Sequence, residues 1–189
     1  MEDKLFNNKY RIPSARLQTW DYANDGAYFI TICTKNRTHY FGEIKNDAMQ
    51  LSTTGALAAH YWNEIPNHFP MVTLANFIVM PNHVHGIIII NNETRHCLVS
   101  THDGNNNLDK TEGQLRYQNQ GKNTVSSIVG SYKSVLTKNA RLTNPNFAWQ
   151  ARFYDIIIKD EIAYNNIQHY IANNVLTWAN DQLYKYTTV

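Results

Sequence analysis

Two histidines, His83 and His85, stand one residue apart at the beginning of the apolar run HVHGIIII. In a β-strand, alternate residues face the same way, so both imidazoles could reach one metal ion while Val84 faces the opposite side. Taken alone, such a pair is more often two hydrogen-bonded histidines at a strand end. Two side chains are also too few for a metal site, so a third ligand would have to come from elsewhere in the chain.

A second pattern with chemical potential lies in the last helical segment, EIAYNNIQHYIANNVLTW. Tyr170 and Asn174 are four residues apart, which places them on one helix face. A phenol could then meet a metal-bound group while the amide oxygen completes the metal site. Of the twelve tyrosines, only Tyr164, with Gln168, has the same arrangement. Six residues separate the two tyrosines, about 240° around a helix, so they cannot share a face. The alternative for Tyr170 is a packing role with its hydroxyl at the surface.

The bulk properties indicate one globular domain over residues 1–189. Apolar residues make up 43% of the chain and charged residues 17%, and the net charge of +2 permits nucleic-acid binding without requiring it. Cys33 and Cys97 lie far apart without CxxC spacing, so neither a disulfide framework nor a zinc ribbon is indicated. The N-terminus has no apolar signal core, and no apolar run is long enough to span a bilayer. We therefore expect a cytoplasmic protein without a membrane partner.

The order of secondary-structure patterns predicts an α+β fold. Strands are expected at Ala27–Thr34, Val72–Met80, His83–Ile90 and Phe153–Lys159, with a hairpin within Tyr40–Leu51. Helices are expected from Ser52 or Thr53 to about Ile65, over Thr124–Leu142, and from Asp160 to about Asn180. Without the hairpin and the last helix, the order is βαββαβ, the ferredoxin-like antiparallel sheet with two helices on one face. The polar stretch 91–123 is expected to form a mobile loop, and the last residues a short tail.

Four segments in the same order resemble the single-tyrosine HUH transposases, and most closely the REP-associated tyrosine transposases. These segments are NFIVMPNHVHGIIII (Asn76–Ile90), SYKS (Ser131–Ser134), WQARFYDIIIKDE (Trp149–Glu161) and YIANNVLTW (Tyr170–Trp178). The His-x-His pair alone is a weak signal, whereas the four segments in order are specific. One departure is Val175, which stands where these transposases commonly have proline.

The resemblance implies a metal-dependent DNA transposase. Such an enzyme cleaves and rejoins hairpin-forming single-stranded DNA through a covalent 5′-phosphotyrosine, and works as a homodimer. By the same resemblance, Tyr170 is the nucleophile, His83 and His85 bind a divalent ion, Mg²⁺ or Mn²⁺, and Asn174 completes its shell. Two alternatives stay open: a non-catalytic or domesticated protein that binds DNA hairpins, and a metal-dependent phosphohydrolase that forms no covalent intermediate.

Basic residues near aromatic ones are candidates for DNA contact. Lys133, Lys138 and Arg141 lie on the helix after the polar stretch, Arg152 precedes the fourth strand, and Arg11 belongs to a basic N-terminus. Cations bind the DNA backbone and aromatic rings stack on bases. For any one of them, a simple solvated surface position is the alternative, although Lys133 falls within the SYKS segment.

Overall fold

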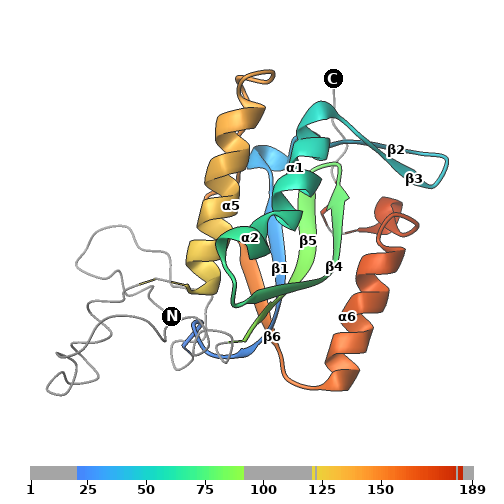
Figure 1. Ribbon diagram of the computed structural model, residues 1–189. Coiled ribbons are helices and arrows are strands. Elements are labelled where there is room, and N and C mark those ends of the chain that lie inside the picture. The colour runs from blue at the N-terminus through green and yellow to red at the C-terminus, as the bar shows by residue number, and fades with distance from the viewer. Residues whose placement is uncertain (1–20, 92–120, 122, 182, 185–189) are drawn as a thin grey trace, which may run out of the picture.

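The computed structural model describes residues 21–91, 121, 123–181 and 183–184 (Figure 1). Arg11, most of the 91–123 stretch and the end of the chain therefore lie outside the described residues. Four antiparallel strands form the main sheet in the order β4-β5-β1-β6. Their bounds are β1 Gly26–Cys33, β4 Val72–Met80, β5 His83–Ile90 and β6 Tyr154–Ile158. A separate hairpin consists of β2 Gly42–Lys45 and β3 Ala48–Leu51.

The helices cover the two faces of this sheet unequally. They are α1 Thr53–Asn63, α2 Ile65–His68, α5 Val125–Ala140 and α6 Glu161–Asn173, with short 3-10 turns at Lys35–Arg37 and Trp178–Asn180. The larger core joins α1 and α5 to one face, and a smaller cluster joins α6 to the other. The predicted α+β arrangement, with an added hairpin and a C-terminal helix, is confirmed. None of the helices in these described ranges is long and apolar enough to cross a membrane.

Local signals in the sequence account for several element boundaries. Ser52 caps α1 by accepting a hydrogen bond from the backbone N–H of Gly55 at 3.1 Å. Asp160 caps α6 in the same way, through the N–H of Ala163 at 2.7 Å. In the hairpin, Asn46 and Asp47 both have positive φ, the conformation that a tight two-residue turn requires.

The predicted extent of the last helix is wrong. The helix ends at Asn173, and Asn174 is its C-cap, rather than continuing to about Asn180. Asparagine side chains compete with the helical hydrogen bonds of the backbone, and Asn173 donates to the carbonyl of His169 at 2.9 Å. The chain then turns back toward the sheet through the 3-10 turn Trp178–Asn180.

The alternation along β5 explains the motif HVHG. Val84 and Ile88 belong to the core beneath α1 and α5, whereas Ile87 belongs to the cluster beneath α6. Gly86 faces the α1 side, where the fully buried ring of Trp62 rests directly on the strand. A Cβ at residue 86 would lie 2.3 Å from that ring, so any larger residue would displace it.

Candidate functional site

The two histidines at the start of β5 point to the same side of the sheet, the α6 side. Their ring centroids are 4.4 Å apart, and both side chains are buried. The Nδ1 atom of His83 lies 2.8 Å from Asn82 Oδ1, and that of His85 lies 2.9 Å from Thr31 Oγ1. These contacts hold each ring by its Nδ1 edge. In the described structure the Nε2 atom of His83 is buried without a hydrogen-bond partner.

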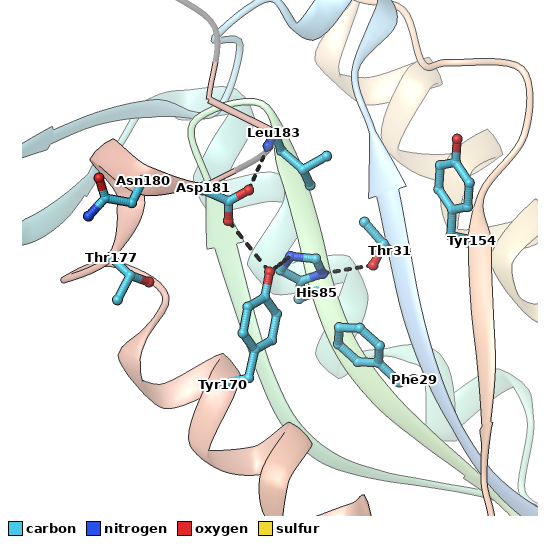
Figure 2. Close-up of a pocket in the computed structure, with 9 residues that line it drawn as sticks. All are labelled: Phe29, Thr31, His85, Tyr154, Tyr170, Thr177, Asn180, Asp181 and Leu183. Carbon is cyan, nitrogen blue, oxygen red and sulfur yellow. Dashed lines mark hydrogen bonds between the residues drawn. The ribbon is translucent and has the colours of Figure 1, made fainter.

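The hydroxyl of Tyr170 approaches His85 from α6 (Figure 2). Its oxygen lies 3.2 Å from His85 Nε2 and 3.5 Å from Asp181 Oδ2. The edge of Phe29 contacts the tyrosine ring, with centroids 6.1 Å apart. Tyr170 is 42% exposed and borders a pocket of about 470 Å³ that opens between α6 and the sheet. An approaching ligand can therefore reach the phenol oxygen.

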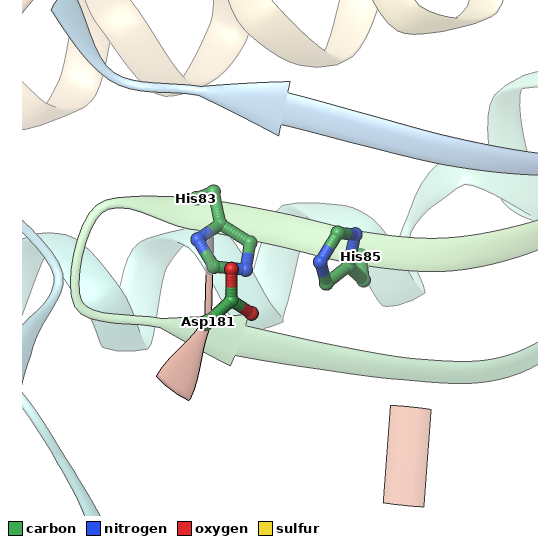
Figure 3. Close-up of side chains that lie close together, drawn as sticks. All are labelled: His83, His85 and Asp181. Carbon is green, nitrogen blue, oxygen red and sulfur yellow. The ribbon is translucent and has the colours of Figure 1, made fainter. Parts of the chain in front are cut away.

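Asp181 is the member of the site that the sequence did not predict. Nitrogen and oxygen atoms of His83, His85 and Asp181 all lie within 4.8 Å of one another (Figure 3). This carboxylate follows the 3-10 turn, and the backbone N–H of Leu183 donates to its Oδ1 at 2.6 Å. On a helix that continued to Asn180, Asp181 would lie about 10 Å along the axis from Asn174. Because α6 ends early, the carboxylate instead folds back over the histidines.

Asn174, predicted as the third ligand, is fully buried beside this group. Its Nδ2 donates to Asp181 Oδ2 at 3.3 Å, while its Oδ1 is buried and has no partner among the described residues. Two unpaired acceptors, His83 Nε2 and Asn174 Oδ1, are costly to bury. A cation at His83 Nε2 would satisfy that nitrogen, and the imidazole and carboxylate donors of the group suit a divalent metal ion.

Burial controls the protonation of the site. Desolvation lowers the pKa of His83 well below its usual range, and the neighbouring His85 lowers it further. Desolvation also lowers the pKa of His85 to about 4, although the charge of Asp181 opposes this shift. Both rings are thus neutral at pH 7, the form that binds metal ions. The pKa of Tyr170 is raised, first by burial and then by the charge of Asp181.

The lowered pKa of His85 predicts acid sensitivity in the metal-free protein. Its unfolded-state pKa is near 6.5 and its folded-state pKa about 4, so the unfolded chain binds more protons between these values. The free energy of unfolding is therefore expected to fall as the pH drops below about 6.5, with a contribution from His85 of about 3 kcal/mol by pH 4. Urea unfolding across this range, with a chelator present, measures it. The His85→Asn variant should show a weaker pH dependence, and an identical one would contradict the assignment.

The remaining predicted site residues lie elsewhere. Tyr164 packs into the apolar cluster between α6 and the sheet, so Tyr170 is the tyrosine that the structure brings to the histidines. Lys133, Lys138 and Arg141 line a groove beside α5, on the opposite face. Arg152 is exposed next to that groove, and Arg11 lies outside the described residues.

One sequence relative and two solved structures are similar to this chain. No protein-family model matches the chain. A Haemophilus influenzae protein described as uncharacterized is 39% identical over 173 residues, which cover 90% of this chain and 92% of that protein. The structure of a REP-associated tyrosine transposase bound to a REP hairpin is similar with a TM-score of 0.57 and 17% identity, over 88% of this chain and 74% of the other. A candidate transposase from Deinococcus radiodurans has 12% identity and a TM-score of 0.46, over 87% and 97% of the two chains.

The Haemophilus influenzae relative establishes the family of this chain, and the structure of the REP-associated tyrosine transposase establishes its fold. Identity of 39% across nearly the whole of both chains groups this chain with the Haemophilus influenzae protein. At 17% identity, the likeness to the transposase concerns the arrangement of helices and strands alone. The chain therefore belongs to one family with the Haemophilus influenzae protein, and it has the fold of the REP-associated tyrosine transposases.

Proposed function

We propose that this protein is a metal-dependent DNA transposase that cleaves and rejoins hairpin-forming single-stranded DNA, with Tyr170 as the nucleophile. The observation that carries the proposal is the position of the Tyr170 oxygen, 3.2 Å from His85 Nε2 and beside the His83–His85–Asp181 group. A nucleophile adjoining candidate metal ligands in an open pocket is the arrangement that phosphodiester transfer requires. The transposase of the same fold was solved with a DNA hairpin bound.

The proposed reaction exchanges one phosphoester for another. The Tyr170 oxygen attacks phosphorus, the bond from phosphorus to the 3′ oxygen breaks, and the DNA carries a 5′-phosphotyrosine. The departing 3′ oxygen takes up a proton from water and becomes a 3′-OH. Attack of a 3′-OH on the phosphotyrosine reverses these steps and rejoins DNA. Because the covalent bond conserves the phosphodiester energy, no nucleotide cofactor is needed.

The phenol must lose its proton before or during attack, and its raised pKa makes that loss unfavourable without an acceptor. Two acceptors face it, His85 Nε2 and Asp181 Oδ2. If a metal ion were held by His85 Nε2 and by Asp181 through its other oxygen, Asp181 Oδ2 would remain as the acceptor for the phenol proton. At 3.5 Å this contact is longer than an ordinary O–H···O hydrogen bond, so the proton passes to Asp181 after a small closure or through one water.

The buried nitrogen of His83 and the Asp181 carboxylate beside it fit a divalent cation held by His83, His85 and Asp181. A bound Mg²⁺ or Mn²⁺ would polarise the scissile phosphate and neutralise its developing charge. Two imidazole donors favour Mn²⁺ over Mg²⁺, which prefers oxygen ligands. The homodimer implied by the sequence resemblance stays a prediction.

Trapping of the covalent intermediate tests this proposal. The protein is incubated with hairpin-forming single-stranded DNA and Mn²⁺ or Mg²⁺, and denaturing electrophoresis then separates free protein from a slower adduct. We expect an adduct that withstands denaturation and is absent when EDTA is added. DNA binding without an adduct under every divalent metal would instead establish the hairpin-binding alternative. Cleavage without an adduct would establish the phosphohydrolase.

A further inference from the structure

A groove of about 630 Å³ runs between α5 and residues 149–153, on the sheet face opposite Tyr170. We call it the α5 groove. Three cations line it, and among the described lining residues there is no carboxylate. Its lining includes Lys133, Lys138, Arg141, Trp149 and Phe153. The pocket at Tyr170 has the opposite character, since it contains Asp181 and no lysine or arginine among its described lining residues.

The floor of the α5 groove is fixed by hydrogen bonds. Lys133 donates from Nζ to the carbonyl of Gln150 at 2.7 Å and lies 5.8 Å from the ring centre of Trp149. Trp149 in turn donates from Nε1 to the carbonyl of Lys133 at 3.2 Å. These bonds tie α5 to the 149–153 segment, so the groove exists before any ligand arrives. Binding to a pre-formed surface costs less conformational entropy than binding to a surface that must first become ordered.

The cations are spaced along α5 in a way that suits a chain of phosphates. Lys133 and Arg141 are eight residues apart, about 12 Å along the helix axis. That length exceeds the roughly 3.4 Å between successive stacked nucleotides, so the helix can meet more than one phosphate of a bound strand. Lys138 and Arg141 are exposed near the end of the helix, three residues apart and therefore neighbours on its surface.

Aromatic side chains beside these cations favour a single strand over a duplex. Trp149 and Phe153 are partly exposed and line the same groove as Lys138. Cations that follow the backbone, together with rings on which unpaired bases stack, are the combination by which proteins bind single-stranded nucleic acid. A duplex keeps its bases stacked on one another and would use only the cations.

The start of β6 connects the α5 groove with the pocket at Tyr170. Phe153 lines the groove, and the next residue, Tyr154, lines the pocket on the opposite face. Tyr154 and His85 both pair with Thr31 in the sheet, one on each side, so two strand spacings, about 10 Å, separate them. In Figure 2, Tyr154 stands across β1 from His85. In the described sheet β6 pairs only with β1 and is an edge strand.

We propose that the α5 groove binds the unpaired DNA strand next to the cleaved phosphate, and that this strand crosses the start of β6, over Tyr154, to reach Tyr170. The inference rests on the proposed function for its substrate. It adds a binding surface for that substrate and a path between the two faces of the sheet. Tyr154 is 56% exposed and has room for a base to stack on its ring as the strand passes.

Charge reversal in the α5 groove tests the binding surface. Lys138→Glu is expected to weaken the binding of a fluorescein-labelled oligothymidine of about 24 nucleotides roughly tenfold, and to reduce its salt dependence. Lys45→Glu is the matched control, because it changes the net charge equally at an exposed site on the β2–β3 hairpin. We expect the control to stay within about twofold of the native chain, since an exposed ion pair contributes little. Equal losses in the two variants, or tighter binding of oligouridine than of oligothymidine, would overturn the proposal.

Photocrosslinking tests the path independently of catalysis. The Tyr170→Phe protein is bound to an oligothymidine that contains 4-thiothymidine, irradiated and digested, and the crosslinked peptides are identified by mass spectrometry. We expect crosslinks at Trp149 or Phe153 and at Tyr154, whereas crosslinks confined to the β2–β3 hairpin would overturn the path.

If no Tyr170 adduct ever forms but Lys138→Glu still loses binding, the α5 groove stands and the transposase proposal fails. If the adduct forms and Lys138→Glu binds as the native chain does, the groove proposal fails alone.

Discussion

The Tyr170→Phe variant is expected to form no covalent adduct with hairpin-forming single-stranded DNA, a loss of at least about 10³-fold. Phenylalanine lacks the oxygen that would bond to phosphorus. The ring keeps its edge contact with Phe29, and only the hydroxyl contacts to His85 and Asp181 disappear. The fold should therefore be retained, and the fraction of protein that migrates as adduct on a denaturing gel measures the effect.

Tyr164→Phe is the matched control for this variant. It makes the same chemical change on the same helix, but at a ring that packs against the apolar cluster and not at the histidines. We expect it to form adduct within about threefold of the native chain, because a substitution away from the reacting group changes little. Loss of the adduct in Tyr164→Phe with its retention in Tyr170→Phe would exchange the roles of the two tyrosines.

The second prediction with a large expected effect concerns the affinity of the site for a metal ion. Asp181→Asn should weaken the binding of Mn²⁺ at least about tenfold, and His83→Ala about a hundredfold or more, measured by isothermal titration. Asp181 supplies the single negative charge of the His83–His85–Asp181 group, and His83 supplies a buried nitrogen that has no other described partner. Asparagine at 181 has the same shape and can still accept from the backbone N–H of Leu183.

Asp47→Asn controls for the removal of a carboxylate, because Asp47 lies in the exposed turn of the β2–β3 hairpin. It should leave Mn²⁺ affinity unchanged. The far-ultraviolet circular dichroism of His83→Ala shows whether that buried substitution leaves the chain folded. If Asp181→Asn binds Mn²⁺ as tightly as the native chain does, Asp181 is not a ligand, and Asn174 becomes the third one.

The fold could be predicted from local patterns because those patterns and the tertiary structure agree. The alternation along β5 places His83 and His85 on one face, and the same period places Val84 in the opposite core. Of the two expected cap residues, Ser52 and Thr53, it is Ser52 that caps α1, and the hairpin expected within Tyr40–Leu51 turns at Asn46 and Asp47. The structure also explains why residue 86 is glycine: the ring of Trp62 lies against the strand there and leaves no room for a Cβ. That contact joins residues far apart in the chain, and no local pattern records it.

The candidate site could be predicted only in part, because local patterns do not record contacts between distant parts of the chain. Tyr170 and Asn174 are related by helical spacing, which is local; the structure places the Tyr170 hydroxyl at His85 and the Asn174 amide at Asp181. Asp181 reaches the site because α6 ends seven residues before the expected position and the chain reverses through a 3-10 turn. A helix boundary depends on a balance of small energies. Here it decides whether the Asp181 carboxylate lies about 10 Å along the helix axis from Asn174 or within 4.8 Å of the histidine nitrogens.

The central claim is that the oxygen of Tyr170 bonds to DNA phosphorus. The most direct test is to trap the adduct in Mn²⁺, digest both protein and DNA, and locate the residual nucleotide by tandem mass spectrometry. We expect a single modified residue, Tyr170, carrying a 5′-linked nucleotide. A nucleotide found on Tyr154, which lines the same pocket, or on Tyr164 would contradict the claim.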